Sequence, residues 1–298
     1  MDRDHISLSR QLGVLQVGAT ALFLGRAWQH WFWDTPYRAL LWDEHWVGPI
    51  VKKFGGTWDA YAASAATDRI IQWSIESLGW FYLLCALAAI LIRRFPRAGG
   101  GFMIAGSAGL IVLSALYYKE QFFYIGQLLE YTLQWSFPLI LWYFVRNRGF
   151  DRPLFLALRV AVALTFTCHG LYAVGFYPVP GQFVSMTMNI LGLGNAEAVQ
   201  FLRVAGILDF IVSAVLFIPD NKVRKAALVY CVFWGAATSF ARVGAFVHWA
   251  DFWHDLHQWL LETLYRFPHF MGPLAGVLYL LGQSKTPAAV IRADYSNS

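Results

Sequence analysis

The segment from Phe246 to Trp259, FVHWADFWHDLHQW, concentrates three histidines and two aspartates among aromatic residues. Imidazole and carboxylate groups are common metal ligands, and His254 and His257, at an i, i+3 spacing, would share one helical turn. The chain has neither an HExxH pattern nor a second cluster that would complete such a site. A metal site here is therefore only a minor alternative. The favoured interpretation is an amphipathic, titratable rim that gates a polar site or docks a partner protein.

Ionisable residues also occur inside strongly apolar runs of the chain. Such a side chain costs at least ~2.5 to 3.5 kcal/mol at the centre of a bilayer, so it normally faces the interior of a helix bundle and is paired. Seven of them fall at one depth below the outer ends of these runs: Arg26, Glu76, Glu130, His169, Arg203, Arg242 and Glu262. The neighbouring residues are His30 on the outer side and Gln134, Arg266 and His269 on the inner side. This set predicts a paired polar layer.

The polar layer has two interpretations. In the first interpretation, the members of the layer hold helices together, since polar contacts between membrane helices contribute roughly 0.6 to 2 kcal/mol each without any ligand. In the second they surround a pocket, because many ionisable groups at one depth usually mark a substrate, ion or proton path. The i, i+4, i+7 spacing of Glu262, Arg266 and His269 places them on one helix face, which suits either interpretation.

The elements that must position these residues are membrane-spanning helices. Hydrophobic residues make up 58% of the 298 positions and charged residues only 14%, which is outside the usual range of soluble proteins. A hydropathy window of about 19 residues predicts eight spans, each near the ~20 residues that cross a bilayer. They cover residues 12–33, 70–92, 101–118, 124–144, 155–176, 197–218, 226–247 and 256–281. We therefore predict an all-α polytopic transmembrane helical bundle.

Basic and aromatic residues predict the orientation of this bundle. More than half of the 23 lysines and arginines lie in the termini and in the connections after the second, fourth and sixth spans. The positive-inside rule then predicts that both termini lie in the cytoplasm. We place the protein in a bacterial-type inner membrane. Tryptophans gather at the opposite interface, as in an aromatic belt, and the histidine-rich segment lies in this belt.

The halves 1–150 and 151–298 share one order of predicted elements. In each half, a span ends near a proline turn (WDTPYRALLW or FYPVPGQF), and an amphipathic segment and three more spans follow. Short motifs also correspond, ESLGWF at 76 with RVAGIL at 203 and QLLEYT at 127 with WLLETL at 259. Because each half has an even number of spans, we predict two four-helix repeats in parallel orientation.

This arrangement resembles the DoxX-like family of membrane proteins. A four-span unit with a helix-terminal proline and a long outer loop after the first span is similar to the unit of that family. The segment TFTCHGLYAVGFYPVPGQF is also similar to its first-span patterns. The chain thus resembles two such units in tandem over nearly its whole length. The resemblance implies an association with quinone-linked membrane oxidoreductases, including subunits of thiosulfate:quinone oxidoreductase.

A quinone site would use the polar layer of the outer leaflet. His169, Glu130 and Glu262 are the residues that we predict to handle protons in catalysis. The residues expected to bind the headgroup are Arg26, His30, Glu76, Arg203, Arg242 and Arg266, whose guanidinium groups would polarise its carbonyls. The sequence carries no flavin, nicotinamide or iron–sulfur fingerprint, so electrons would come from a periplasmic or membrane redox partner. Whether the chain itself catalyses a reaction is left open.

Other interpretations remain beside the quinone site. His30 and His169 lie near the outer ends of corresponding spans and would ligate a haem from two sides, which is a minor alternative. The main alternative is a non-enzymatic carrier, receptor or assembly factor that binds a membrane lipid or a partner protein. Transport is less favoured, because glycine and proline pairs do not break the spans except near Pro138 and Pro273.

Several classes of function have no support in the sequence. The three cysteines lie in apolar runs without CxxC spacing, so they predict neither a disulfide framework nor a structural zinc site. The net charge of +5 is explained by the basic residues on the predicted cytoplasmic side of the spans. The sequence has no long basic surface and no phosphate-binding loop, so it predicts neither nucleic-acid nor nucleotide binding.

Overall fold

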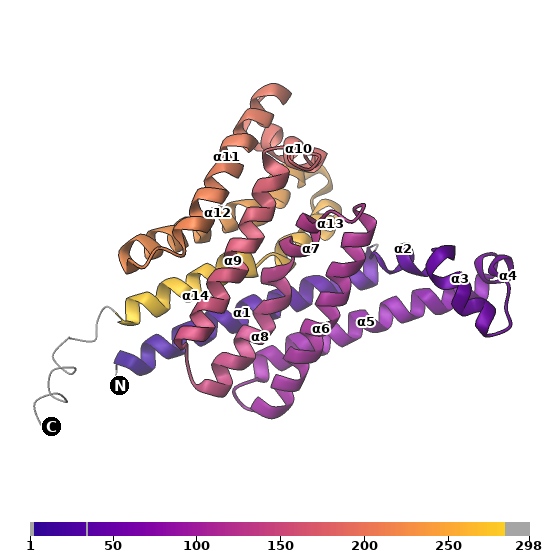
Figure 1. Cartoon of the computed structure of the whole chain (residues 1–298), viewed down its shortest axis with the longest axis horizontal. Coiled ribbons are helices and arrows are strands. Elements are labelled where there is room, and N and C mark those ends of the chain that lie inside the picture. The colour runs from indigo at the N-terminus through magenta and orange to yellow at the C-terminus, as the bar shows by residue number, and fades with distance from the viewer. Residues whose placement is uncertain (1–2, 34, 284–298) are drawn as a thin grey trace, which may run out of the picture.

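The computed structural model describes residues 3–33 and 35–283, and every regular element in that part of the chain is a helix (Figure 1). Five helices are long and apolar enough to cross a membrane: α5 (Ala65–Leu91), α6 (Pro96–Glu120), α9 (Arg152–Ala173), α11 (Asn195–Val215) and α12 (Asn221–Phe246). The predicted all-α membrane class is confirmed at this level. The eight spans and their orientation stay predictions.

The other three predicted spans contain one long helix and two broken ones. Helix α1 (Arg3–Phe32) covers the first span. The fourth span is divided into α7 (Ile125–Glu130) and α8 (Thr132–Asn147), and the eighth into α13 (Phe252–Tyr265) and α14 (Pro268–Gln283). Pro138 and Pro273 each follow the last residue before the break by eight positions. The sequence located the interruptions near these prolines, but the helices break about two turns earlier.

Side chains of neighbouring helices bind the backbone groups near the first break. The hydroxyl of Ser114 donates to the carbonyl of Leu128 at 3.0 Å, and the amide of Leu133 donates to the hydroxyl of Thr165 at 3.1 Å. In an apolar environment an unpaired backbone group would cost several kcal/mol, so such partners allow a helix to break inside a bundle.

Helix α12 packs closely against the second break. Gly235 faces the carbonyl of His269, and a β-carbon at this glycine would collide with that carbonyl. Pro273 stands four residues after His269 and has no N–H group to donate to the same carbonyl. One turn beyond Gly235, the hydroxyl of Ser239 donates to the carbonyl of Gly235 at 2.6 Å and also lies 3.3 Å from the carbonyl of Arg266.

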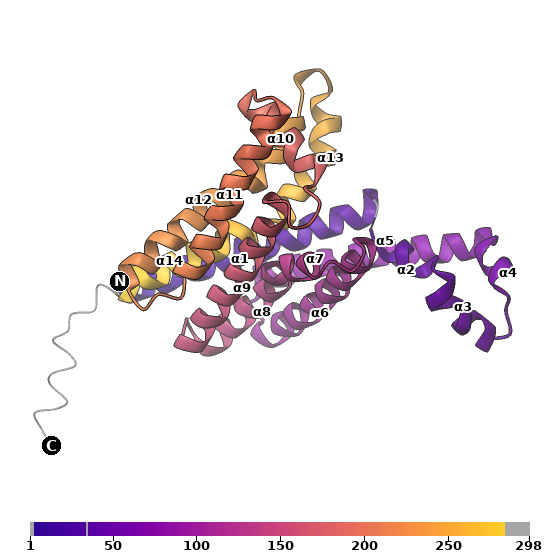
Figure 2. The same cartoon turned by 45° about the horizontal axis from the view of Figure 1, so that its top comes forward.

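Short helices follow the first long helix of each half. They are α2 (Tyr37–Leu41), α3 (Glu44–Lys53) and α4 (Trp58–Ala62) after α1, and α10 (Gly181–Leu191) after α9, while the 3-10 turn η1 (Trp249–Asp251) precedes α13. The predicted amphipathic segment of the first half is helical in α3. In both views, α3 and α4 lie beside the start of α5, whereas α10 and α13 lie at the end of the second half that is away from the start of α1 and the end of α14 (Figures 1 and 2).

The packing of the two halves follows one pattern. Helix α1 contacts α5 and α8, as α9 contacts α11 and α14, and α6 packs on α7 and α8 as α12 packs on α13 and α14. Across the halves, α1 lies against α13 and α14, and α9 lies against α7 and α8. One hydrophobic core therefore contains helices of both halves. The division of the chain into two repeats, residues 1–150 and 151–298, stays a prediction. The three cysteines, Cys85, Cys168 and Cys231, are buried free thiols.

Candidate functional site

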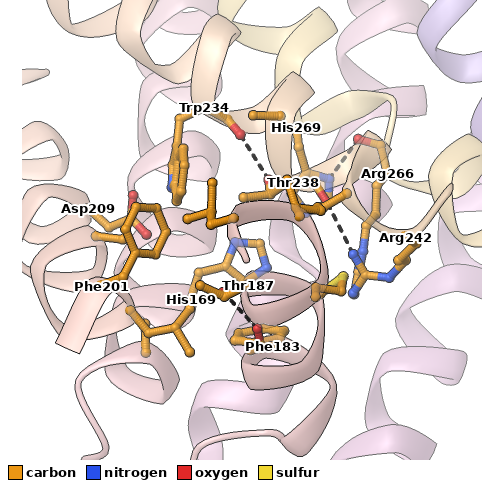
Figure 3. A pocket seen from close by; sticks show the side chains of 18 of the residues that line it. His169, Phe183, Thr187, Phe201, Asp209, Trp234, Thr238, Arg242, Arg266 and His269 are labelled. Atoms are coloured by element: carbon orange, nitrogen blue, oxygen red, sulfur yellow. Dashed lines mark hydrogen bonds between the residues drawn. The ribbon is translucent and has the colours of Figure 1, made fainter. Parts of the chain in front are cut away.

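A cavity of about 300 Å³ lies in the second half, between α9, α10, α11, α12 and the break before α14 (Figure 3). Most of its wall is apolar, with Phe183, Ile190, Leu191, Phe201 and Phe233 among the lining residues. We call it the apolar cavity. A concave apolar space with a few polar groups is the usual form of a small-molecule site.

Two buried polar atoms without partners belong to residues at the α14 side of the apolar cavity. The Nδ1 atom of His269 lies 2.9 Å from the carbonyl oxygen of Arg266, and because a carbonyl only accepts, Nδ1 must carry the proton. In the neutral ring, Nε2 of His269 is then an acceptor, and it has no partner although the residue is only 2% exposed. The Nε atom of Arg266 is also buried without a partner. Such groups are costly to bury unless a ligand or a water satisfies them.

Asp209 on α11 adds a buried carboxylate to the wall of the apolar cavity. It is 3% exposed, and its Oδ1 atom has no hydrogen-bond partner. Leu202, Ala205 and Asp209, spaced i, i+3, i+7, all line the cavity, so the sequence of α11 places the carboxylate on its inner face. Asp209 is absent from the set predicted from the sequence, although an aspartate in the apolar run GILDFIV is the same signal as the other ionisable residues in apolar runs.

A chain of ionisable groups connects the apolar cavity with the first half of the protein. His169 lines the cavity, and its Nε2 atom lies 2.9 Å from Oε1 of Glu130 on α7. Arg266 lies 4.0 Å from the same carboxylate oxygen, and the rings of His169 and His269 are stacked with centroids 5.3 Å apart. Three of the residues predicted for the site, His169, Glu130 and Arg266, are thus brought together, with His269 beside them.

A second cavity of about 370 Å³, the polar cavity, lies between the two halves. Its lining includes amides, phenols and charged groups from Gln29, Tyr117, Gln121, Gln127, Tyr131, Gln182, Gln258, Glu262, Tyr265 and Arg266. Because Gln121 is exposed, this cavity reaches the protein surface. Arg266 lines both cavities, and Arg242 of the apolar cavity forms an ion pair with Glu262 of the polar one. The predicted residues Arg242, Glu262 and Arg266 therefore form a partition between the two cavities.

Arg26 is fully buried in a cluster of its own beside the polar cavity. It donates to Gln29 at 2.7 Å and to Gln134 at 2.5 Å, and its guanidinium carbon lies 3.9 Å from the ring centre of Tyr265. His30 lies 2.6 Å from the carbonyl of Arg26 through Nδ1, so it is held by α1 itself. Neither residue lines the apolar cavity, and His30 and His169 contact different groups.

Two predicted site residues, Glu76 and Arg203, line neither the apolar nor the polar cavity. Glu76 accepts a hydrogen bond from Gln72 at 2.9 Å, which in turn accepts one from Arg38 at 2.9 Å, on the first-half side of the bundle. Arg203 is exposed on α11, next to the inward-facing Leu202. Successive helix positions are rotated by about 100°, so residues at the same depth need not share a face.

The histidines of the segment 246–259 have separate neighbours. The backbone amide and the ring of His248 both lie 2.9 Å from Oδ2 of Asp255, and these hydrogen bonds hold the pKa of the Asp255 carboxyl below its usual range. The ring of His257 packs instead against Trp28, Phe32 and Trp33, at centroid distances of 5.1, 5.1 and 5.7 Å. Among the described residues, no three His, Cys, Asp or Glu side chains are grouped closely enough to hold a metal ion.

Comparison of the chain with protein-family models, with curated proteins and with solved structures gave no match. The resemblance to the DoxX-like family therefore stays a prediction.

Proposed function

We propose that this protein is an integral membrane subunit of a quinone-linked redox system, and that it binds a quinone-type headgroup in the apolar cavity. One observation carries the proposal. A largely apolar space inside a helical bundle ends in buried polar atoms of Arg266 and His269 that have no protein partner. An apolar molecule with a polar ring edge would fill this space and satisfy these atoms.

The residues around the cavity fit such a ligand in two ways. The aromatic and aliphatic side chains of α10, α11 and α12, including Phe183, Phe201 and Phe233, would bury the ring and the first part of an isoprenoid tail. The Nε–H group of Arg266 has no partner in the protein and would donate to an oxygen on the ring. A bound quinone would supply reversible two-electron, two-proton chemistry.

The hydrogen bond between His169 and Glu130 supports a route for protons. His169 lines the apolar cavity, whereas Glu130 stands next to Tyr131, which lines the polar cavity. Imidazole and carboxylate groups exchange protons readily, and the polar cavity reaches the surface. We infer that His169 and Glu130 move protons between the ligand and water, while electrons pass to or from a partner protein.

The proposal includes a finer arrangement in the membrane. We infer eight spans, built as two DoxX-like four-helix repeats in parallel orientation, in a bacterial-type inner membrane with both termini in the cytoplasm. The matching contact patterns of the two halves support this arrangement. So does the position of the start of α1 and the end of α14 at one end of the bundle in both views (Figures 1 and 2).

The direct test is ligand binding by the purified protein in mild detergent. We expect a short-chain benzoquinone to bind saturably in equilibrium dialysis, and Arg266→Gln to weaken its binding by about tenfold. Arg203→Gln is the matched control, because Arg203 is exposed outside the cavity. A dithionite-reduced minus air-oxidised spectrum would separately detect co-purified quinone, or a haem through its Soret band. Absence of saturable binding to the wild-type protein would contradict the proposal.

A second candidate is a non-enzymatic carrier, receptor or assembly factor that binds a lipid. The apolar character of most of the cavity wall favours it, because an acyl chain would be buried there equally well. This candidate predicts that fatty acid displaces the benzoquinone probe, that phospholipid or fatty acid co-purifies, and that Glu130→Gln does not alter binding.

A further inference from the structure

The apolar cavity offers two buried hydrogen-bond acceptors that the protein leaves without donors. One is Nε2 of His269, whose other ring nitrogen donates to the carbonyl of Arg266. The other is Oδ1 of Asp209. Both residues line the cavity and both are at most 3% exposed, so solvent does not compensate them from the protein surface.

The two acceptors approach the cavity from different walls. Asp209 belongs to α11 and lies near Phe201 and Trp234 on one side of the cavity, while His269 and Arg266 belong to the α13–α14 break on the other side (Figure 3). A small ring between these walls would therefore meet an acceptor at each end.

The hydroxyl groups that line the cavity are already used as donors inside the protein. The hydroxyl of Thr187 donates to the carbonyl of Phe183 at 2.9 Å, and that of Thr238 donates to the carbonyl of Trp234 at 3.0 Å. They cannot donate to a ligand without giving up these bonds. The Nε–H of Arg266 is the unpaired buried donor among the described lining residues.

We propose that the apolar cavity selects a ring with hydroxyl groups at both ends, which for the function proposed above is the reduced, hydroquinone form of the headgroup. One hydroxyl donates to Nε2 of His269 and accepts from Nε–H of Arg266. The other hydroxyl donates to Oδ1 of Asp209. A quinone carbonyl has lone pairs only, so it would pair with Arg266 and leave both acceptors of the protein unsatisfied.

This inference predicts selectivity between two oxidation states of one molecule. A site that is built to hydrogen-bond a hydroxyl rejects an analogue without that proton, because the buried polar groups of the site are then left unpaired. We expect the hydroquinone to bind at least about tenfold more tightly than the quinone, since a buried polar group left without a partner costs about 1–3 kcal/mol.

The experiment measures binding rather than turnover. The full-length protein in mild detergent is dialysed anaerobically against a short-chain benzoquinone or against its hydroquinone, and the two dissociation constants are compared. Asp209→Ala removes one acceptor without filling the cavity. It should weaken hydroquinone binding by about tenfold, whereas quinone binding should not weaken, because a quinone leaves this acceptor without a partner. Asp209→Asn, which retains the shape of the side chain and adds N–H donors, should shift the preference toward the quinone. Arg203→Gln, on the same helix, is the control.

The outcomes separate this inference from the function on which it rests. Equal affinities of the wild-type protein for both forms, or an unchanged preference in both Asp209 variants, would overturn the selectivity but leave the quinone site in place. Saturable binding of neither form to the wild-type protein would overturn both proposals. A preference for hydroquinone that disappears in Asp209→Ala supports both.

Discussion

The guanidinium carbon of Arg26 lies 3.9 Å from the ring centre of Tyr265, and Nε2 of His169 lies 2.9 Å from Oε1 of Glu130. Arg26 and His169 stand on α1 and α9, the first long helices of the two halves. Tyr265 and Glu130 are the last residues before the breaks of the two broken helices. Each pair therefore joins the first helix of one half to the break of the other half.

The two halves use this shared arrangement differently. When ESLGWF is aligned with RVAGIL, the residues that follow these motifs, Tyr82 of α5 and Asp209 of α11, occupy equivalent positions in the two halves. In the first half, the ring of Tyr82 is fully buried against Phe23 and His30, at centroid distances of 6.0 and 4.9 Å. In the second half, the shorter Asp209 lines the apolar cavity. A large ring packs the one interior, and a small carboxylate leaves space in the other.

Replacement of Tyr82 by alanine should therefore destabilise the protein. Removal of a fully buried aromatic ring from a packed interior costs about 3–5 kcal/mol, because transfer energy is lost and a cavity remains. We expect Tyr82→Ala to lower the midpoint of thermal unfolding in detergent, whereas Asp209→Ala, at the corresponding position, should leave it unchanged or raise it. Equal losses in the two variants would contradict the difference between the halves.

The ion pair of Arg242 and Glu262 gives a second prediction. The side chain of Arg242 is only 3% exposed, so Glu262→Gln would leave a buried guanidinium without its counter-charge. We expect a loss of about 3 kcal/mol in the free energy of unfolding, measured by denaturant titration in micelles. Glu44→Gln is the control, because Glu44 is an exposed glutamate on α3.

The double variant Arg242→Met and Glu262→Leu tests the origin of this loss. Because both charges are then absent, it should be more stable than Glu262→Gln alone. If the single variant is as stable as the parent, the partition between the cavities does not depend on this pair.

Gly235 provides a third prediction, on the packing of the second break. A β-carbon at this position would meet the carbonyl of His269, which is backbone and cannot turn away. Gly235→Ala should cost about 1–3 kcal/mol of stability and weaken ligand binding at the adjacent His269. The control is Gly101→Ala on α6, where no atom lies within 4 Å, and the better helix propensity of alanine should stabilise by up to about 1 kcal/mol. An unaffected Gly235→Ala protein would show that α12 does not hold the break.

The pair of Asp255 and His248 predicts a dependence on pH. Hydrogen bonds from His248 lower the pKa of Asp255 in the folded protein, so they stabilise the fold above the unfolded pKa of about 3.9. This stabilisation is lost as the pH falls through the lower folded pKa. Asp255→Asn should thus unfold at a lower temperature than the parent at pH 7, and the difference should shrink below about pH 4. Asp251→Asn, at an exposed aspartate of the same segment, is the control.

The positions of the apolar helices along the chain were predictable from the sequence, but the orientation of residues around each helix was not. Hydropathy located the apolar helices, and counting along them placed His169, Glu130, Arg242 and Glu262 near one level. The same count included Arg203, which faces outward because its neighbour Leu202 takes the inner face. A single span has a weak face preference when nearly all its residues are apolar, so only packing against other helices decides it.

The sequence also did not predict which helices of the two halves contact each other. The hydrogen bond of His169 to Glu130 depends on α9 packing against α7, and no local pattern specifies which helices of two similar halves become neighbours. The breaks in the fourth and eighth spans depend on the hydroxyl groups of neighbouring helices, such as Ser114, which bind the backbone there. Proline alone indicated only that an irregularity was nearby.

The burial of all three cysteine thiols makes the protein suitable for chemical mapping. A membrane-impermeant maleimide added to intact cells should react with an engineered surface cysteine while the native Cys85, Cys168 and Cys231 stay shielded. A cysteine introduced in the α3–α4 segment and another in the connection between α5 and α6 would then report, by labelling from one side only, which face of the bundle looks outward.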